Sequence, residues 1–199
     1  ASIEGKPVGS FGDVAAFSFF ANKIITCGEG GALILNDSRL TNRAAELRDH
    51  GMDKTKRYWH KYVGYNYRMT NMQAAVGLAQ IEQFPMFVKK RQIIWDQYHK
   101  FLDGSDIFEF QSSHISHSPA NWLFTLLINS DEYPSIEEII SRLKEFGIES
   151  RPVFYPMSEM PSFSECAIIH NDVNCKSVSR RGLSLPSSIS LSEEEIKYI

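Results

Sequence analysis

The sequence has few cysteines and no long apolar run. Its three cysteines, Cys27, Cys166 and Cys175, are too few and too scattered for a disulfide framework, which favours a reduced, cytoplasmic location. No apolar stretch approaches the roughly 18 residues that a membrane helix needs, and no signal peptide is visible. These absences argue against a disulfide-stapled secreted protein and against a membrane-spanning one.

Strongly basic segments are also missing. The longest basic run is Lys89-Lys90-Arg91, and the net charge is −3. A nucleic-acid or anionic-membrane surface is therefore not indicated. The chain of 199 residues is 43% hydrophobic and 23% charged, which is typical of a soluble globular protein with one large domain or two small ones.

Both ends of the sequence resemble positions inside a longer polypeptide. Residue 1 is Ala, and the first residues are typical of a turn. At the other end, Ser192 and Glu195 form a capping-box pattern, but the chain stops within about two turns, which is too short for a stable isolated helix. We expect the chain to be the C-terminal part of a longer protein.

The first half of the chain alternates short apolar segments with turn residues. Residues 14–20 and 32–35 are typical of buried strands, with a glycine-rich turn at 28–31 between them. A helix capped by Asn36-Asp37-Ser38 should follow and end before Gly51. Residues 52–70 are irregular and rich in Tyr, His and Arg, which favours either a binding loop or an aromatic oligomer contact.

The second half predicts helices followed by an α/β layer. Thr70 or Asn71 should cap a helix that continues to about residue 84, and a longer helix should follow Pro85. The stripe Phe87, Ile94, Tyr98 and Phe101 predicts a core-facing side of that helix. Beyond it we expect a strand at 123–128, a helix at 136–146, a strand at 148–153 and a final helix. We place the domain boundary between residues 86 and 87.

Lys23 is the most informative single residue. It lies in the apolar run 15–26, and the nearest formal charges are Asp13 and Glu29. Burying an unpaired ammonium costs several kcal/mol, and the amine escapes this cost by losing its proton. A neutral lysine amine is a nucleophile suited to Schiff-base chemistry. The alternative is a surface lysine at a strand end.

Other polar residues give weaker signals. Ser18 lies five residues before Lys23, so its hydroxyl could reach an anion near the lysine, or it could simply bond to the backbone. His114-Ile115-Ser116-His117 lies in a loop-like segment without an acidic or cysteine partner, which favours a loop pair over a metal site. We therefore predict no metal.

Several short motifs occur in a fixed order across nearly the whole chain. They are Gly9-Ser10-Phe11-Gly12-Asp13, Phe17-Ser18-Phe19-Phe20-Ala21-Asn22-Lys23, Gly28-Glu29-Gly30-Gly31, Arg48-Asp49-His50-Gly51, Tyr58-Trp59-His60, Gly64-Tyr65-Asn66-Tyr67-Arg68-Met69-Thr70-Asn71, Gln73-Ala74-Ala75 and Leu185-Pro186-Ser187-Ser188. Together they resemble the sugar aminotransferases of the DegT/DnrJ/StrS family. The resemblance implies an α/β fold: the pyridoxal-phosphate (PLP)-dependent transferase fold type I, like aspartate aminotransferase. Residues 1–86 would be part of the large PLP-binding domain, and residues 87–199 a linker helix and the small C-terminal domain.

The resemblance also implies the chemistry. Lys23 would form a Schiff base with PLP and then move protons as a general acid and base. Ser18 matches the family serine that binds the cofactor phosphate. Asn66 matches an asparagine that reaches this phosphate from the partner subunit, which implies a homodimer with a shared active site. Glutamate would be the amino donor.

The substrate is expected to be a nucleotide sugar. Tyr58-Trp59-His60 and the segment 151–156 most resemble family members that aminate a GDP-linked 4-keto-6-deoxy sugar of the perosamine type, used in lipopolysaccharide and O-antigen biosynthesis. His60, Tyr62 and Arg68 could line the sugar-nucleotide pocket. Arg151 could bind the substrate phosphate, or it could be a salt-bridged strand arginine.

Two departures from the family pattern qualify these expectations. Ser158 stands where many members carry a histidine. The family's aspartate that pairs with the pyridinium nitrogen, and the helix that binds most of the phosphate, would precede Ala1, so residues 1–199 alone should bind PLP weakly. Two alternatives remain: a catalytically inactive remnant or interaction domain that keeps the fold and dimer surface, and a related PLP-dependent sugar dehydratase. Lys23 argues against the dehydratases, which carry histidine at that position.

Overall fold

The computed structural model describes residues 1–129, 134–166 and 172–199, and the chain divides into two compact units. Unit 1 comprises residues 1–87 and 115–119, and unit 2 comprises residues 88–114 and 120–199. Both contain helices and strands, as the α/β class requires. The sequence did not predict that residues 115–119 belong with unit 1. None of the helices in the described ranges combines the length and apolarity needed to cross a bilayer.

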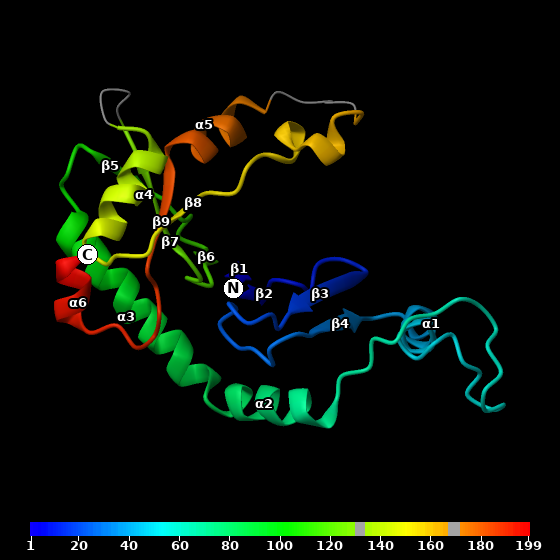
Figure 1. Ribbon diagram of the computed structural model, residues 1–199. Helices are drawn as coiled ribbons and strands as arrows, with labels where there is room; N and C mark the ends of the chain where they lie inside the picture. The colour runs from blue at the N-terminus through cyan, green and yellow to red at the C-terminus, as the bar shows by residue number, and fades with distance from the viewer. Residues whose placement is uncertain (130–133, 167–171) are drawn as a thin grey trace. The chain divides into compact units, whose positions relative to one another are not determined.

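Unit 1 is built on two small antiparallel sheets and two helices (Figure 1). In the first sheet, β1 (Ser2–Ile3) pairs with β2 (Lys6–Pro7) on one side and β6 (His117–Ser118) on the other. In the second, β3 (Val14–Ser18) pairs with β4 (Gly31–Leu35), so that Ser18 lies opposite Gly31. The helices are α1 (Ser38–Arg48) and α2 (Asn71–Glu82).

Side-chain caps fix where these helices begin, as the sequence predicted. The Asp37 carboxylate accepts hydrogen bonds from the backbone N–H groups of Arg39 and Leu40 at the start of α1. Thr70 and Gln73 form a reciprocal capping box at the start of α2. These bonds satisfy backbone donors that have no partner within the helix. The start of α2 is therefore well defined, which matters because the segment before it carries several candidate site residues.

Unit 2 is a four-stranded antiparallel sheet with helices. The strand order is β5-β7-β9-β8. The strands are β5 (Phe108–Phe110), β7 (Phe124–Ile128), β8 (Arg151–Pro152) and β9 (Gly182–Leu185). The helices are α3 (Phe84–Leu102), which begins in unit 1, α4 (Ile136–Glu145), α5 (Val173–Arg181) and α6 (Glu193–Tyr198), with short 3-10 turns at Met157–Glu159 and Pro161–Phe163.

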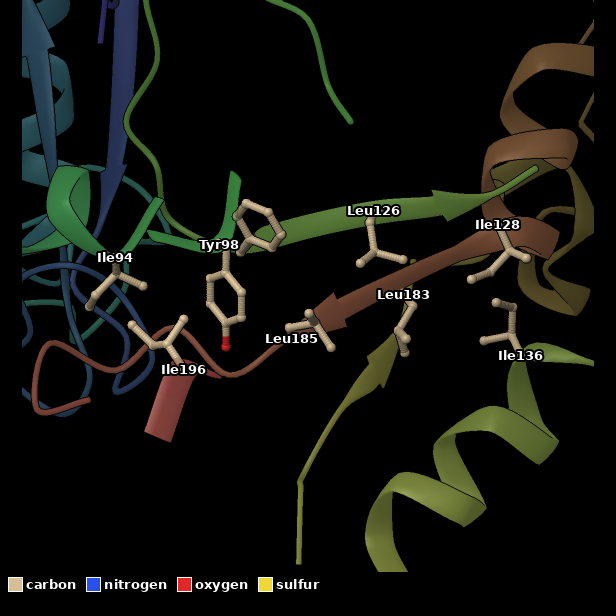
Figure 2. Close-up of a cluster of buried hydrophobic side chains, with 9 residues drawn as sticks. Ile94, Tyr98, Leu126, Ile128, Ile136, Leu183, Leu185 and Ile196 are labelled. Carbon is tan, nitrogen blue, oxygen red and sulfur yellow. The ribbon is translucent and has the colours of Figure 1, made fainter. Parts of the chain in front are cut away.

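The core of unit 2 lies between its sheet and its helices. Figure 2 shows side chains of β7 and β9 beside those of α3, α4 and α6. Tyr98 is 1% exposed, stacks on Phe124 with 4.4 Å between ring centroids, and donates its hydroxyl to the Pro186 carbonyl. Burial raises the pKa of the Tyr98 phenol, so this donor stays protonated. The predicted core-facing stripe of α3 is confirmed by the burial of Phe87, Ile94 and Tyr98.

One strand prediction in unit 2 was wrong, and some elements were not predicted. The strand predicted at 148–153 is reduced to β8, because the Ile148 N–H closes the end of α4 by donating to the Leu143 carbonyl. β9 and α5 were missed altogether. β9 is fully buried, but Gly182 and Ser184 interrupt its apolar pattern, so it gives no strand signal in the sequence.

Unit 1 leaves much of its apolar surface exposed. Its only buried apolar side chains are Cys27 and Phe87, and the side chains of its β3–β4 sheet are largely open to solvent, with Leu33 and Ile34 more than half exposed. Soluble proteins rarely expose contiguous apolar patches of this kind unless another surface covers them. Such a sheet is expected to be covered in the functional protein.

Neighbouring residues of α3 test the core of unit 2. Ile94 is 3% exposed and Ile93 is 46% exposed, although both are isoleucines on one helix. Ile94→Ala should lower the free energy of unfolding by about 2–5 kcal/mol, because it leaves a cavity, whereas Ile93→Ala should cost about 1 kcal/mol or less. Urea unfolding of the two variants measures the difference. Equal losses would contradict the core described above.

Candidate functional site

Lys23 lies on a closed loop that joins β3 to β4. The Phe19 carbonyl closes the base of this loop, accepting hydrogen bonds from the Thr26 hydroxyl at 3.0 Å and from the Cys27 N–H at 3.1 Å. Within the loop, the Lys23 N–H donates to the Phe20 carbonyl at 3.0 Å. The Lys23 side chain is half-buried. The lysine is therefore held on an ordered loop, not at a simple strand end.

A glycine turn packs this loop against α2. Gly28 has φ +83°, which favours glycine, and a Cβ at Gly30 would lie 2.7 Å from the Cys27 sulfur. The Glu29 carbonyl accepts hydrogen bonds from the Gln73 side-chain amide at 3.1 Å and from the Cys27 thiol at 3.2 Å. The capping residue of α2 thus also fixes the turn that follows Lys23. The sequence did not predict the contacts of Thr26 and Gln73 with this loop, although Gln73 belongs to one of the family motifs.

Ser18 stands at the start of the same loop. Its Oγ accepts a hydrogen bond from the Phe20 N–H at 3.3 Å, and the residue is exposed. A serine hydroxyl has one donor besides its acceptor sites, so the O–H of Ser18 can still donate to an anion. The structure therefore places an amine and a hydroxyl donor, Lys23 and Ser18, on one short loop.

A second group of predicted site residues is attached to the C-terminal end of α1. The backbone of residues 65–67 bonds to the backbone of residues 47–50, and Asp49 and Asn66 form an isolated bridge. His60 is held by its Nδ1, which donates to the His50 carbonyl at 2.9 Å, since that oxygen can only accept. The other polar atom of the ring is Nε2, and the residue is exposed to solvent.

The Tyr62 side chain contacts two residues of α1. Its hydroxyl donates to the Glu46 carboxylate, and the Arg43 guanidinium lies 3.5 Å from the centre of its ring. A substrate could use the Tyr62 hydroxyl only by displacing Glu46. The structure thus favours an anchoring role for Tyr62. The sequence did not predict this contact, because Glu46 and Arg43 lie on the preceding helix.

Arg68 and Asn66 are more accessible. The Arg68 guanidinium lies 3.5 Å from the Asp49 carboxylate, with its side chain 64% exposed. An exposed pair of this kind contributes little to stability and leaves Arg68 able to meet another anion. Within the described part of the chain, the Asn66 carboxamide makes no hydrogen bond, and the residue is exposed. Asn66 is therefore available to a group outside this chain.

Asp53 shapes the loop that carries His60. Its carboxylate accepts from the Lys61 ammonium at 2.8 Å, from the Thr55 N–H and hydroxyl at 2.7 and 2.6 Å, and from the Lys56 N–H at 3.1 Å. The Lys61 contact, followed by the Thr55 bonds, holds the pKa of Asp53 well below its usual range. Asp53 also raises the pKa of Lys61. Sequence reasoning missed this anchor, although Asp followed by Thr two positions later is a common turn pattern.

Arg151 belongs to unit 2. It begins β8, is exposed, and pairs with Glu149 at 3.1 Å, both side chains being more than 60% open to solvent. Ser158 donates its hydroxyl to the Asp172 carboxylate. Arg151 is therefore a salt-bridged strand arginine whose guanidinium stays accessible. Within the described ranges, no cluster of three or more His, Cys, Asp or Glu side chains is placed to hold a metal.

Comparison with known proteins identifies the family. The model of the DegT/DnrJ/EryC1/StrS aminotransferase family matches residues 1–199. The chain belongs to this family. A curated relative, GDP-perosamine synthase of Escherichia coli O157:H7, is 41% identical over 196 residues, which is 98% of this chain and 52% of that protein. The chain thus spans about half the length of the curated relatives it matches.

Solved structures confirm the fold. PseC of Helicobacter pylori, an aminotransferase involved in the biosynthesis of pseudoaminic acid, matches with a TM-score of 0.91 and 26% identity, over 99% of this chain and 54% of that one. A putative sugar aminotransferase from Streptococcus pneumoniae, solved in its PLP form, matches with a TM-score of 0.86 and 25% identity, over 98% and 52%. The family is PLP-dependent, and the predicted type I transferase fold is confirmed.

The Asp53 anchor predicts a local effect of mutation. Asp53→Asn should speed hydrogen exchange in residues 53–62 several-fold at pH 7, because the amide binds Lys61 less strongly than a carboxylate does. The exposed Asp13→Asn variant is the control. Exchange mass spectrometry measures both, and an unchanged rate in Asp53→Asn would contradict the anchoring role.

The same anchor has a defined pH dependence. Because the pKa of Asp53 is lowered on folding, its stabilising effect is complete above the unfolded value of about 4 and is lost as the pH falls further, through the lower folded pKa. Protection of residues 53–62 should therefore be insensitive to this group between neutral pH and about pH 4.

Proposed function

We propose that the protein containing this chain is a PLP-dependent aminotransferase that transfers an amino group from glutamate to a nucleotide-linked 4-keto-6-deoxy sugar. The observation that carries the proposal is the placement of Lys23 on an ordered loop, with the Ser18 hydroxyl at the start of the same loop. Family membership and the 41% identity to a GDP-perosamine synthase support it. The relative's activity is that protein's own, and for this chain it is a hypothesis.

The residues present fit PLP in two respects. A half-buried primary amine, Lys23, and an accessible hydroxyl donor, Ser18, match the aldehyde and the phosphate of that cofactor. The turn at Gly28 and Gly30 removes side-chain bulk next to the loop. We assign Lys23 to covalent attachment and Ser18 to the phosphate. Further contacts with the cofactor are expected from parts of the family fold outside residues 1–199.

The cofactor and the protein would each supply a different part of the transamination chemistry. When bound, PLP supplies an electron sink that makes the C–H bond beside the transferred nitrogen acidic. Lys23 contributes the base: its amine takes up a proton from one carbon and delivers it to another. Ser18 orients the phosphate by donating its hydroxyl proton. These roles need Lys23 at a fixed position, and the closed loop fixes its backbone.

Substrate recognition is assigned to the exposed polar residues. His60 and Arg68 are accessible on the segment attached to α1, and Arg151 is accessible in unit 2. An arginine suits a diphosphate because its planar guanidinium binds two oxygens at once. Tyr62, bonded to Glu46, would hold this segment in place. We propose a GDP-linked sugar on the strength of the E. coli relative.

A homodimer with shared active sites completes the proposal. The Asn66 carboxamide has no partner among the described residues, and the β3–β4 sheet exposes apolar side chains that another surface would cover. Asn66 of one subunit would then contact the cofactor phosphate of the other. Three free cysteines support a reducing, cytoplasmic location, where nucleotide sugars for lipopolysaccharide and O-antigen would be made.

Loss of Lys23 tests the proposal most simply. Full-length protein mixed with PLP should give an absorbance band near the visible edge, and Lys23→Ala should abolish it because the attacking amine is gone. Lys89→Ala, which removes an exposed lysine of α3, should leave the band intact. An absorbance band that persists in Lys23→Ala would contradict the assignment of Lys23 as the residue that links to PLP. The absence of the band in the unmodified protein would favour an inactive remnant.

The shared site predicts complementation between two defective subunits. Asn66→Ala should weaken PLP binding about 10- to 100-fold, the usual cost of one hydrogen bond to a charged group. Mixing Lys23→Ala and Asn66→Ala subunits should restore transamination with GDP-4-keto-6-deoxymannose and glutamate, because one site of each heterodimer regains both residues. Activity that stays at the level of the separate variants would rule out the shared arrangement.

A further inference from the structure

We infer that Thr26 is a positioning residue for Lys23: its hydroxyl closes the loop 20–25 and thereby fixes where the Lys23 amine lies. The inference deepens the proposed function and rests on it for the role of Lys23. The geometric part, closure of the loop by one hydroxyl, stands independently of that role.

The Thr26 hydroxyl makes two hydrogen bonds at the base of the loop. It donates to the Phe19 carbonyl at 3.0 Å and accepts from the Gly28 N–H at 2.9 Å. Phe19 precedes the loop and Gly28 follows it, so one side chain joins both ends. The threonine is half-buried, so its bond to the Phe19 carbonyl is partly shielded from competing water, whereas its bond from the Gly28 N–H is exposed.

The other hydrogen bond at the base of the loop does not replace the two bonds of the Thr26 hydroxyl. The Cys27 N–H also donates to the Phe19 carbonyl, at 3.1 Å, so one bond survives the loss of the Thr26 hydroxyl. The Gly28 N–H, however, loses its side-chain acceptor. The loop is therefore expected to remain folded but to open more often. Catalytic groups lose efficiency when displaced by as little as 1 Å, so Lys23 is the residue that such opening affects.

Cys27 provides a built-in reporter of this opening. It follows Thr26 directly and is only 5% exposed, whereas Cys166 and Cys175 are exposed and free. Its thiol donates to the Glu29 carbonyl at 3.2 Å, within the same closed turn. A thiol reagent should reach Cys27 only when the base of the loop opens, while the two exposed thiols serve as internal standards.

The first experiment measures thiol labelling in the full-length protein without cofactor. Thr26→Val keeps the shape of threonine but removes the hydroxyl, and should raise the rate of Cys27 alkylation about tenfold, as expected for two lost hydrogen bonds. Thr26→Ser keeps the hydroxyl and should label at close to the original rate. If Thr26→Val fails to fold, Thr26→Ala makes the same comparison.

The second experiment measures how fast Lys23 links to PLP, followed by the absorbance band. Thr26→Val should slow this reaction about tenfold, because a lysine displaced by about 1 Å attacks less efficiently, and Thr26→Ser should restore it. Rapid Cys27 labelling with an unchanged linkage rate would show that Thr26 only stabilises the fold, which overturns the inference. Unchanged Cys27 labelling in Thr26→Val would overturn it as well.

Lys23→Ala separates failure of the inference from failure of the proposed function. If PLP still links to the protein in this variant, the proposed role of Lys23 is wrong, whatever Thr26 does. If the linkage disappears in Lys23→Ala but Thr26→Val behaves like the original protein in both experiments, the proposed function stands and the positioning role of Thr26 is wrong.

Discussion

The carbonyl oxygen of Phe19 is the point on which the candidate site depends. It accepts hydrogen bonds from the Thr26 hydroxyl and the Cys27 N–H, and so converts the connection between β3 and β4 into a closed loop. Lys23 gains a fixed backbone position because of this closure. The Glu29 carbonyl then connects the turn that follows Lys23 to α2 through Gln73.

The two units contribute differently to the protein. Unit 2 has its own core, centred on Tyr98 and Phe124, and this core does not require any candidate site residue. Unit 1 carries most of the candidate site but buries little apolar surface. Its accessible polar residues, above all Asn66 and Arg68, and its open β3–β4 sheet are the features expected of a surface that meets other protein. The candidate site and incomplete burial therefore occur together in unit 1.

Local signals made much of this predictable from sequence. Thr70 and Asp37 marked helix starts because short polar side chains satisfy unpaired backbone donors, and the stripe containing Ile94 and Tyr98 marked a buried face. The ordered motifs identified the family. The anchors of the site were not predictable, because the bond between Tyr62 and Glu46 joins residues from different elements. β9 was missed because its burial comes from the surrounding sheet and not from its own composition.

The most direct test of the central claim is a crystal structure of the full-length protein grown with PLP. The account predicts continuous electron density from the Nζ atom of Lys23 to the cofactor. It further predicts the Ser18 hydroxyl within hydrogen-bond distance of the phosphate, with Asn66 of the second subunit on the other side. Cofactor bound elsewhere, or a Lys23 side chain directed away from it, would contradict the account.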